Sequence, residues 1–519
     1  MKEEFEAPQD EDPLIELKKY LGNKNVPPNG FSLRELNDSD VKKLLKGLKG
    51  KKSLGLDWIC GFSLKIASTC LEQELKTLVN ISIRKSKFVD SWKCAKILPG
   101  WKNKGTRFEL KYYRPLSNLS EVSKLVEKAV YEQMYDYLVS NDLIHPNHNG
   151  FLKGTSTSSA LQQMFDIWLK HLDKGNLAAA LFLDLSAGFD VINHRILLLK
   201  MKEYNFSEDT INWFSTYLLD RTQCVQIESA FSPSIPVPWG VPQVSILGPL
   251  LFLFFLNELP DIVKETPGDT LDDNDSEIVI YADDNTPMTS DKDPLALQTK
   301  IQDEANCVTN WFSKNDMICS SEKTKLLVIG TAANLKSKIK NQNLALEVNV
   351  CGVEKAESSS EKLLGVLVNN TATFKNHLYG DTDNKGLLKE LSIRVGMLRR
   401  LKKYMPVNKL KTVMEGMSGS KLVYRITVWG RVWHIPGSLD EAAQTRTSSS
   451  LTKEDVRKLQ VLQNKCLRMV TDSDYKTPTE VLLKKTNSLS VHQRIAHLSL
   501  SQVYNIHKTK LPAYHHSRV

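Results

Sequence analysis

The stretch LAAALFLDL, residues Leu177–Leu185, is a short apolar run that ends beside an acid, Asp184. A run of this length and composition is typical of a buried strand. A second run, EIVIYADD at Glu277–Asp284, has the same form and ends on Asp283 and Asp284. We predict that the two strands pair, so that carboxylates 99 residues apart in the sequence lie together at their ends.

Clustered carboxylates suggest a cation site. They repel one another and raise each other's pKa unless a cation neutralises them. Hard oxygen ligands suit Mg²⁺, which retains waters and takes phosphate oxygens as further ligands. Two such ions about 4 Å apart can activate a 3′-hydroxyl and stabilise a leaving pyrophosphate. An Asp-Asp pair after a strand is also an ordinary turn or helix cap, so the pair alone leaves both interpretations open.

The composition is that of an ordinary globular protein. The chain has 519 residues, 41% of them hydrophobic and 25% charged, which excludes a wholly disordered, collagen-like or coiled-coil chain. The length suffices for about three domains. The longest apolar run, Ile246–Leu256, is shorter than the roughly 20 residues of a membrane-spanning helix, and the acidic start is no secretory signal.

Charge alternates along the chain. Residues 41–130 carry 20 Lys or Arg and 7 Asp or Glu, a net charge of +13. Residues 384–519 carry 25 bases and 9 acids, a net of +16, whereas residues 261–304 carry 3 bases and 13 acids, a net of −10. Basic regions suit a phosphate backbone, although each block is also consistent with a solvated protein face.

The cysteines indicate an intracellular protein. None of the eight lies in a CxxC pair or at zinc-binding spacing with histidine, and scattered cysteines of this kind are typical of reduced thiols. We therefore expect a nuclear or cytoplasmic protein that is not secreted and contacts no membrane.

Apolar periodicity predicts further elements. Helices are predicted over Leu33–Leu48 (capped by Ser32), Leu64–Ile83, Lys124–Leu138, Ile196–Leu219, Pro242–Asn257, Asp293–Asn315 and much of the chain after Asn384. Additional strands are predicted over Cys224–Ile227, Ile235–Pro238 and Lys325–Ile329. Flexible loops are predicted at Lys49–Asp57, Gly268–Ser276 and Gly437–Ser450.

The two acidic strands belong to an ordered series of motifs. In chain order these are KKSLGLDWI (Lys51–Ile59), WKCAKILPGWKNKG (Trp92–Gly105), YYRPLSNLSEVSKLVEK (Tyr112–Lys128), NGFLKGTSTSSAL (Asn149–Leu161), LFLDLSAGFDVINH (Leu181–His194), GVPQVSILGPLLFLFFLNELP (Gly240–Pro260), IVIYADDNT (Ile278–Thr286), WFSKNDMICSSEKT (Trp311–Thr324), KLLGVLVNNTATFKNHL (Lys362–Leu378) and YRITVWG (Tyr424–Gly430). Together they resemble the reverse transcriptase of non-LTR (LINE-type) retrotransposons, of the Jockey-like and chicken-repeat-like kind. The resemblance covers roughly Leu33 to Arg494.

This resemblance implies an α+β chain with the right-hand polymerase fold. That fold has fingers, a palm with a small antiparallel sheet, a thumb and a helical C-terminal region. The implied divisions are a loose acidic leader (1–32), fingers with an N-terminal extension (33–175), a palm with motifs A to D and the segment leading to the thumb (176–383), and a basic, thumb-like helical region (384–519).

The resemblance also assigns the catalytic centre. Asp184 and Asp283 match ligands of two Mg²⁺ ions, for which Mn²⁺ is an alternative, and Asp284 is a supporting carboxylate. Lys323 matches a lysine that protonates the pyrophosphate leaving group. Taken alone, Lys323 would be assigned to the solvated surface.

Four further residues match nucleotide-binding positions. Phe189 matches the steric gate that excludes a 2′-hydroxyl, and Gln243 matches a glutamine beside the incoming nucleotide. Arg114 matches the fingers arginine, whose guanidinium suits a triphosphate, and Lys153 is the remaining base in the NGFLKG segment. Taken alone, Phe189 would be a core aromatic and Arg114 a surface residue.

Three positions depart from the family pattern, and the mildest change is Ser320, which stands where the family usually has Asn. Val244 stands where the family has a glycine after PQ, and a β-branched side chain there adds bulk and stiffens the backbone. Leu152 replaces an arginine after GF, which removes a phosphate or template contact. The resemblance implies RNA-directed DNA synthesis from an RNA template, a DNA primer and dNTPs. A catalytically inactive relic that binds nucleic acid is the alternative, which the changes at Val244 and Leu152 keep open. The endonuclease of the family is expected to be absent, because the first 30-odd residues have no room for it.

Overall fold

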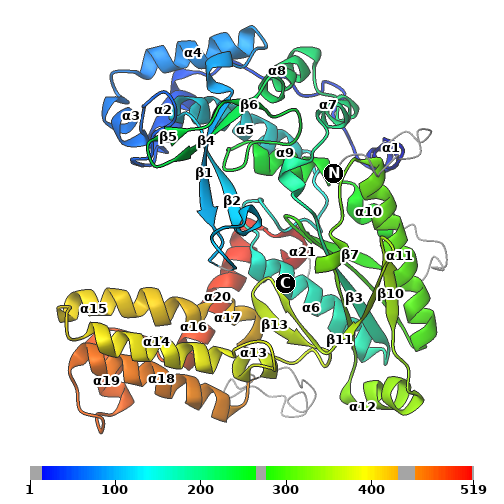
Figure 1. Cartoon of the computed structure of the whole chain (residues 1–519), viewed down its shortest axis with the longest axis vertical. Coiled ribbons are helices and arrows are strands. Elements are labelled where there is room, and N and C mark those ends of the chain that lie inside the picture. The colour runs from blue at the N-terminus through cyan, green and yellow to red at the C-terminus, as the bar shows by residue number, and fades with distance from the viewer. Residues whose placement is uncertain (1–13, 104, 265–275, 431–450, 517–519) are drawn as a thin grey trace.

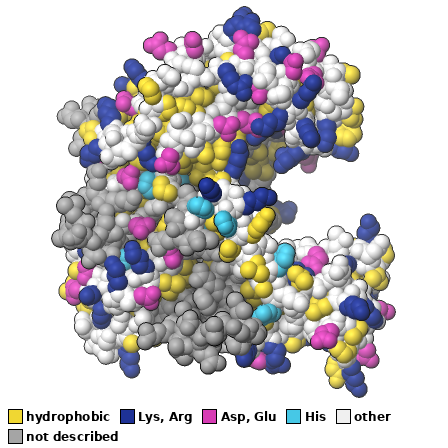
Figure 2. Space-filling view, turned by 180° about the vertical axis from the view of Figure 1, so that it is seen from behind, with side chains coloured by type: hydrophobic (Ala, Val, Ile, Leu, Met, Phe, Trp, Pro, Cys, Tyr) yellow, Lys and Arg dark blue, Asp and Glu magenta, His cyan; other side chains and the backbone are white. Residues whose placement is uncertain are grey.

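The structure, a computed structural model, describes residues 14–103, 105–264, 276–430 and 451–516. An N-terminal lobe (residues 38–140 and 208–236) and a C-terminal lobe (residues 387–486) flank a central sheet in a mixed α+β fold (Figure 1). Figure 2 shows a deep hollow between the lobes, bordered on the N-terminal lobe by Lys and Arg side chains. The loops predicted at Gly268–Ser276 and Gly437–Ser450 lie outside the described residues, except for Ser276.

The central sheet carries both acidic strands. Its strands, in sheet order, are β10 (Glu347–Val350), β11 (Val353–Ser358), β9 (Lys325–Ile329), β3 (Leu177–Asp184), β8 (Asp284–Asp291) and β7 (Glu277–Tyr281). The predicted strands β3, β7 and β9 are confirmed, and β9 has the predicted bounds.

The predicted pairing of the two acidic strands is wrong, because β8 lies between them. The chain reverses after β7 through Ala282, whose φ is +57°, and returns as β8, which pairs antiparallel with both β7 and β3. The returning strand was not predicted because it reads NTPMTS and looks polar, yet Thr286 and Ser290 are buried within it. The acids still meet, since Asp184 pairs with Asp284 across β3 and β8.

The two faces of β3 pack against different helices. Leu181 and Leu183 belong to the same core cluster as α11 (Pro294–Lys314), whereas Ala178 and Ala180 belong to the cluster that includes α6 (Thr157–Asp173). Successive side chains in a strand point to opposite faces, so both faces of β3 are covered and the apolar run is explained.

The N-terminal lobe combines a small sheet with helices. Strand β1 (Cys94–Trp101) pairs antiparallel with β2 (Tyr113–Asn118) and parallel with β4 (Thr222–Ile227). The remaining elements of this lobe and its junction with the central sheet are β5 (Ala230–Phe231), β6 (Ile235–Pro236), α2 (Asp38–Lys46), α3 (Gly61–Ala67), α4 (Glu72–Arg84), α5 (Glu121–Ser140), α7 (His194–Glu203), α8 (Glu208–Leu218), α9 (Gly248–Phe255) and α10 (Leu259–Lys264).

Several predicted helices have different bounds in the structure. The helix predicted over Leu64–Ile83 is divided into α3 and α4, which end and begin at Ala67 and Glu72. The helix predicted from Leu33 begins at Asp38, because Asn37 forms a reciprocal capping box with Asp40. The helix predicted over 196–219 is split into α7 and α8, and Ser207 caps the second of them. The helix predicted after Pro242 begins at Gly248.

The predicted loose leader is wrong for the part that the structure describes. Residues Ile15–Gly22 form helix α1, which buries Leu17 and Tyr20 in the main core cluster. The Tyr20 hydroxyl donates to the main-chain oxygen of Leu143 at 2.9 Å. Burial of these apolar side chains, rather than the acidic composition, therefore determines the conformation of this segment.

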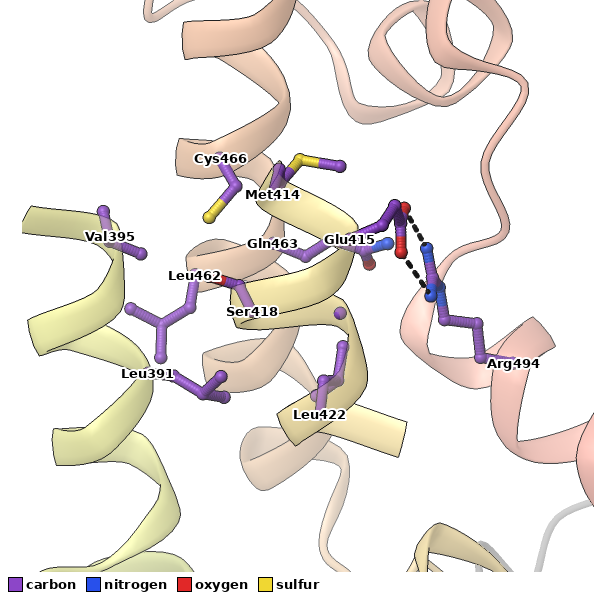
Figure 3. Close-up of a pocket in the computed structure, with 11 residues that line it drawn as sticks. Leu391, Val395, Met414, Glu415, Ser418, Leu422, Leu462, Gln463, Cys466 and Arg494 are labelled. Carbon is purple, nitrogen blue, oxygen red and sulfur yellow. Dashed lines mark hydrogen bonds and ion pairs between the residues drawn. The ribbon is translucent and has the colours of Figure 1, made fainter. Parts of the chain in front are cut away.

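The C-terminal lobe is helical, as predicted for residues after Asn384. It follows a hairpin of β12 (Ser360–Leu363) and β13 (Val366–Asn369) and helix α13 (Lys375–Tyr379). Its helices are α14 (Leu387–Leu401), α15 (Val407–Met414), α16 (Ser420–Val423), α17 (Ile426–Trp429), α18 (Lys453–Thr471) and α19 (Thr479–Thr486). A cavity of about 20 Å³ between α14, α15 and α18 is closed at one side by the ion pair of Glu415 and Arg494 (Figure 3), and it is too small for a nucleotide.

The last helices return to the central sheet. Helix α20 (Val491–Thr509) and helix α21 (Ala513–His516) lie against α6 (Figure 1). Gln502 hydrogen-bonds Gln162, and the Tyr514 hydroxyl donates to Asp166 at 2.8 Å. None of the helices in the described ranges is both long and apolar enough to cross a membrane.

Candidate active site

Three aspartates lie at one end of the central sheet. Asp184 is the last residue of β3, Asp284 is its partner at the start of β8, and Asp283 lies in the turn before it. Desolvation by the surrounding chain, together with the charge of Asp184, raises the pKa of Asp283. Desolvation and the charges of Asp283 and Asp184 raise the pKa of Asp284 to about 6. The carboxylates thus repel one another, as the sequence predicted.

Two cations face this cluster. Lys323 Nζ lies 2.9 Å from Asp184 Oδ2, and the Ser320 N–H donates to the main-chain oxygen of Asp184 at 2.8 Å. Arg114, on β2 of the N-terminal lobe, and Lys323 both oppose the rise in the pKa of Asp283. The structure therefore brings Lys323 and Arg114 to the acids, as the sequence predicted.

The donor atoms fit a hard divalent cation. Among the described residues, no three His, Cys, Asp or Glu side chains are gathered as a ready-made metal cage. Mg²⁺ does not require one, because it is usually held by one or two carboxylates together with waters and substrate phosphates. Asp184 and Asp283 supply such oxygens, and burial together with the neighbouring carboxylates raises the pKa of Asp283 and of Asp284, which a bound cation would oppose.

Phe189 follows Asp184 by five residues, and its ring is packed rather than free. Its ring stacks on Phe252 of α9, with centroids 4.5 Å apart and planes at 12°, and meets Phe151 edge-on at 5.7 Å. The ring is only partly buried, so it is fixed in orientation while part of it remains accessible to solvent.

The segments around Phe189 and Gln243 are joined by main-chain hydrogen bonds. Val241 N–H donates to the Phe189 oxygen at 2.8 Å, and Gly240 N–H donates to the Ile192 oxygen at 2.9 Å. Gly240 has a φ of +79°, and a Cβ there would lie 2.6 Å from the Cα of Asp190. Only glycine allows this close approach.

Val244 occupies a strained backbone position. Its φ is +67° and its side chain is 56% exposed, so a β-branched residue stands in the left-handed region that favours glycine. The sequence indicated this position through the departure from the family pattern, and the structure supplies the conformational reason.

Glu127 holds the loop that contains Val244 through hydrogen bonds to its main chain, and this residue was not predicted from the sequence. This fully buried carboxylate of α5 accepts hydrogen bonds from the N–H groups of Ile246 at 2.7 Å and Leu247 at 3.4 Å. Burial raises its pKa. The glutamate stands in the quoted YYRPLSNLSEVSKLVEK segment, but no local signal in that segment shows that it meets a loop 119 residues later.

The NGFLKG segment lies against the acidic turn through its glycine. A Cβ on Gly150 would lie 2.4 Å from the nitrogen of Ala282, and Asn149 N–H donates to the Ile280 oxygen at 2.8 Å. The sequence reasoning considered Leu152 and Lys153 instead. Leu152 packs against the core, and Lys153 Nζ lies 4.3 Å above the ring of Tyr135.

Arg425 reaches the acids from the C-terminal lobe. Its charge opposes the rise in the pKa of Asp284, and its Nε donates to Thr157 at 2.9 Å. The residue stands in the quoted YRITVWG segment. Its role could not be assigned from the sequence, because its proximity to Asp284 depends on how the C-terminal lobe packs against the central sheet.

Acids at the ends of the antiparallel strands β3 and β8, faced by Lys323 and Arg114, are typical of the site of a metal-dependent nucleotidyltransferase. The chain belongs to the reverse transcriptase (RNA-dependent DNA polymerase) family, whose profile matches residues 101–368. The resemblance seen in the sequence is therefore confirmed.

Curated relatives come from mobile elements of Drosophila melanogaster. The chain is 25% identical, over 89% of its length, to the probable RNA-directed DNA polymerase from transposon BS, of which the match covers 48%. It is 25% identical, over 70% of its length, to the RNA-directed DNA polymerase from mobile element jockey, of which 38% is covered. The probable RNA-directed DNA polymerase from transposon X-element is 24% identical over 84% of the chain, with 44% of the relative covered. The chain thus spans less than half the length of these relatives.

Proposed function

We propose that this chain is an RNA-directed DNA polymerase of a non-LTR retrotransposon, which extends a DNA primer on an RNA template. The observation that carries the proposal is the pairing of Asp184 with Asp284, beside Asp283 and within reach of Lys323. In this proposal the N-terminal lobe forms the fingers, the central sheet the palm and the C-terminal lobe the thumb.

Each residue then has a defined task. Asp184 and Asp283 would hold divalent cations, with Asp284 in support. Two Mg²⁺ ions bound there would supply activation of the primer 3′-hydroxyl and stabilisation of the departing pyrophosphate. Lys323 donates a proton to the leaving group, and Arg114 binds the triphosphate through its guanidinium.

The remaining contacts select and grip the substrate. Phe189, fixed by its stack on Phe252, excludes a 2′-hydroxyl, while Gln243 contacts the incoming nucleotide. The basic lobes bind the RNA–DNA duplex through its phosphates and read helix shape rather than sequence. Lys153 contributes charge at the template side.

Primer extension tests the proposal. The wild type and Asp283→Ala are compared on poly(rA)–oligo(dT) with dTTP and Mg²⁺. We expect extension by the wild type and at least a 10²-fold loss in the variant, of the order that removal of one electrostatic catalytic group causes. Equal extension by both proteins would contradict the assigned acids.

A second function is favoured by the strained backbone of Val244. If that loop blocks the substrate, the chain is an inactive relic that binds nucleic acid through its basic lobes. It would then show no extension, salt-sensitive duplex binding, and the same binding by Asp283→Ala.

A further inference from the structure

Asp190 has no task in the proposed function, yet its carboxylate accepts hydrogen bonds from Gln243. Gln243 Nε2 lies 2.8 Å from Oδ1 and 2.9 Å from Oδ2 of Asp190. The Asp190 side chain is exposed and that of Gln243 is partly so. The pair is therefore not demanded by core packing, and an exposed pair of this kind adds little to stability.

The backbone holds both residues in place. The main-chain hydrogen bonds of Gly240 and Val241 to Ile192 and Phe189 flank Asp190 on both sides. The close contact of Gly240 with the Asp190 backbone leaves no room for the two segments to slide. The carboxylate consequently meets the glutamine amide in one fixed arrangement.

This arrangement determines which end of the amide points away from Asp190. A primary amide has a donor NH₂ and an acceptor oxygen, and its terminal torsion is broad and nearly two-fold. A carboxylate accepts hydrogen bonds only, so it selects the NH₂ group and directs Oε1 away from itself.

We propose that Asp190 is a positioning residue that orients Gln243 so that its carbonyl oxygen accepts a hydrogen bond from the incoming nucleotide. This inference rests on the proposed function, in which Gln243 contacts that nucleotide. The donor on the nucleotide is a hydroxyl of the sugar or an N–H of the base.

Asp190→Asn tests the inference with little change of shape. Asparagine can donate as well as accept, so Gln243 can turn its NH₂ toward the nucleotide. We expect KM for the dNTP to rise about tenfold, the loss of one well-placed hydrogen bond, while kcat stays within about twofold. Asp190→Asn in a Gln243→Ala background should add nothing, because the residue acts through the glutamine.

A matched control comes from a second amide–carboxylate pair at the surface. Asn193 Nδ2 lies 2.5 Å from Asp316 Oδ2, and Asp316→Asn should leave KM and kcat unchanged. Dideoxynucleotides, which lack the 3′-hydroxyl, distinguish the donors: their KM is insensitive to Asp190→Asn if the sugar hydroxyl is the donor, and rises as for dNTPs if the base is.

Two results would overturn the inference. A loss in kcat that is equally large with and without Gln243 would show that Asp190 acts independently of the glutamine. An unchanged KM in Asp190→Asn would show that the amide needs no orientation. Absence of extension by the wild type is a different result, because it removes the proposed function itself and the inference with it.

Discussion

Lys323 and Asp184 form an ion pair across the end of β3, with Nζ 2.9 Å from Oδ2. The lysine side chain is 62% exposed and the aspartate side chain 27%, so the pair is accessible to solvent. Ser320 ties the lysine-bearing segment to the main chain of Asp184. Lys323 is thus the counterion of a carboxylate that the proposed function assigns to Mg²⁺.

Two substitutions of Lys323 distinguish the effect of its positive charge from its action as a proton donor. Lys323→Ala should lower kcat about 10²-fold if the lysine protonates the leaving group. Lys323→Arg keeps the charge but does not release a proton, because the arginine pKa is far too high, and should be nearly as slow. Single-turnover extension measures both variants, with Lys325→Ala as the control. Full activity in Lys323→Arg would show that the charge alone matters.

The pKa of Asp284, raised to about 6, predicts a pH-dependent demand for metal. As the pH falls through about 6, Asp284 takes up a proton that a cation must displace. The Mg²⁺ concentration for half-maximal extension should therefore rise roughly tenfold between pH 8 and pH 5. Asp284→Asn should show a weaker dependence on pH, as measured by Mg²⁺ titrations of extension.

The Asp284 carboxyl group also determines how the free energy of unfolding depends on pH when no metal is present. Its folded pKa is higher than the ordinary value of 3.8, so its contribution to folding is most favourable below about 4 and is lost as the pH rises to about 6. The free energy of unfolding of Asp284→Asn should therefore be about 1–2 kcal/mol higher than that of the wild type at pH 8. At pH 4 the two proteins should have the same free energy of unfolding. Urea denaturation in EDTA measures the difference, and equal stability at pH 8 would contradict it.

Val244→Gly should relieve the backbone strain. A non-glycine residue in the left-handed region lowers the free energy of unfolding by about 1–3 kcal/mol. Glycine removes this strain but loses more conformational entropy on folding, which offsets about 0.5–1 kcal/mol of the gain. We expect a net gain of about 1 kcal/mol in the free energy of unfolding and faster extension. Val244→Ala is the matched control, because it removes the branch but keeps the Cβ and most of the strain. Equal gains in both variants would assign the effect to side-chain bulk.

Gly150→Ala should disturb the acidic turn. Its Cβ would lie 2.4 Å from the Ala282 nitrogen, so the turn that carries Asp283 must move. We expect extension to fall about 10²-fold, since misplacement of reacting groups by about 1 Å has effects of this size. Gly396→Ala, where the added Cβ meets no atom within 4 Å, should keep full activity and gain up to about 1 kcal/mol in helix stability.

Glu127→Ala should loosen the loop that bears Gln243. It leaves the N–H groups of Ile246 and Leu247 buried without the acceptor they have now. Thermal denaturation should show a loss of about 2–3 kcal/mol. Glu132→Ala, on the same helix, removes surface ion pairs to Lys43 and Lys128 and should change stability by less than about 1 kcal/mol. Similar losses in the two variants would contradict the anchoring role.

Local signals in the sequence sufficed for the strands whose residues are apolar. Strand β9 was predicted with its bounds, and β3 within one residue, because continuous apolar runs of this length have few alternatives. Strand β8 was not predicted, because Thr286 and Ser290 are polar residues. They are buried because β8 lies between β3 and β7 in the sheet.

The acids and Lys323 could be placed from motif order, but their supporting contacts could not. Glu127, Gly150 and Arg425 act through residues far away in sequence, and no periodicity or spacing links such partners. Their contributions depend on which loop each meets after folding, which only the three-dimensional arrangement shows.

The return of the final helices to α6 has a consequence for biosynthesis. Gln162 and Gln502 are 340 residues apart, so a ribosome adding 5–20 residues per second needs roughly 17 to 68 s between them. During this interval the nascent chain exposes the α6 surface that α20 and α21 later cover. The contacts of α20 and α21 with α6 therefore form only after these two helices have left the ribosome.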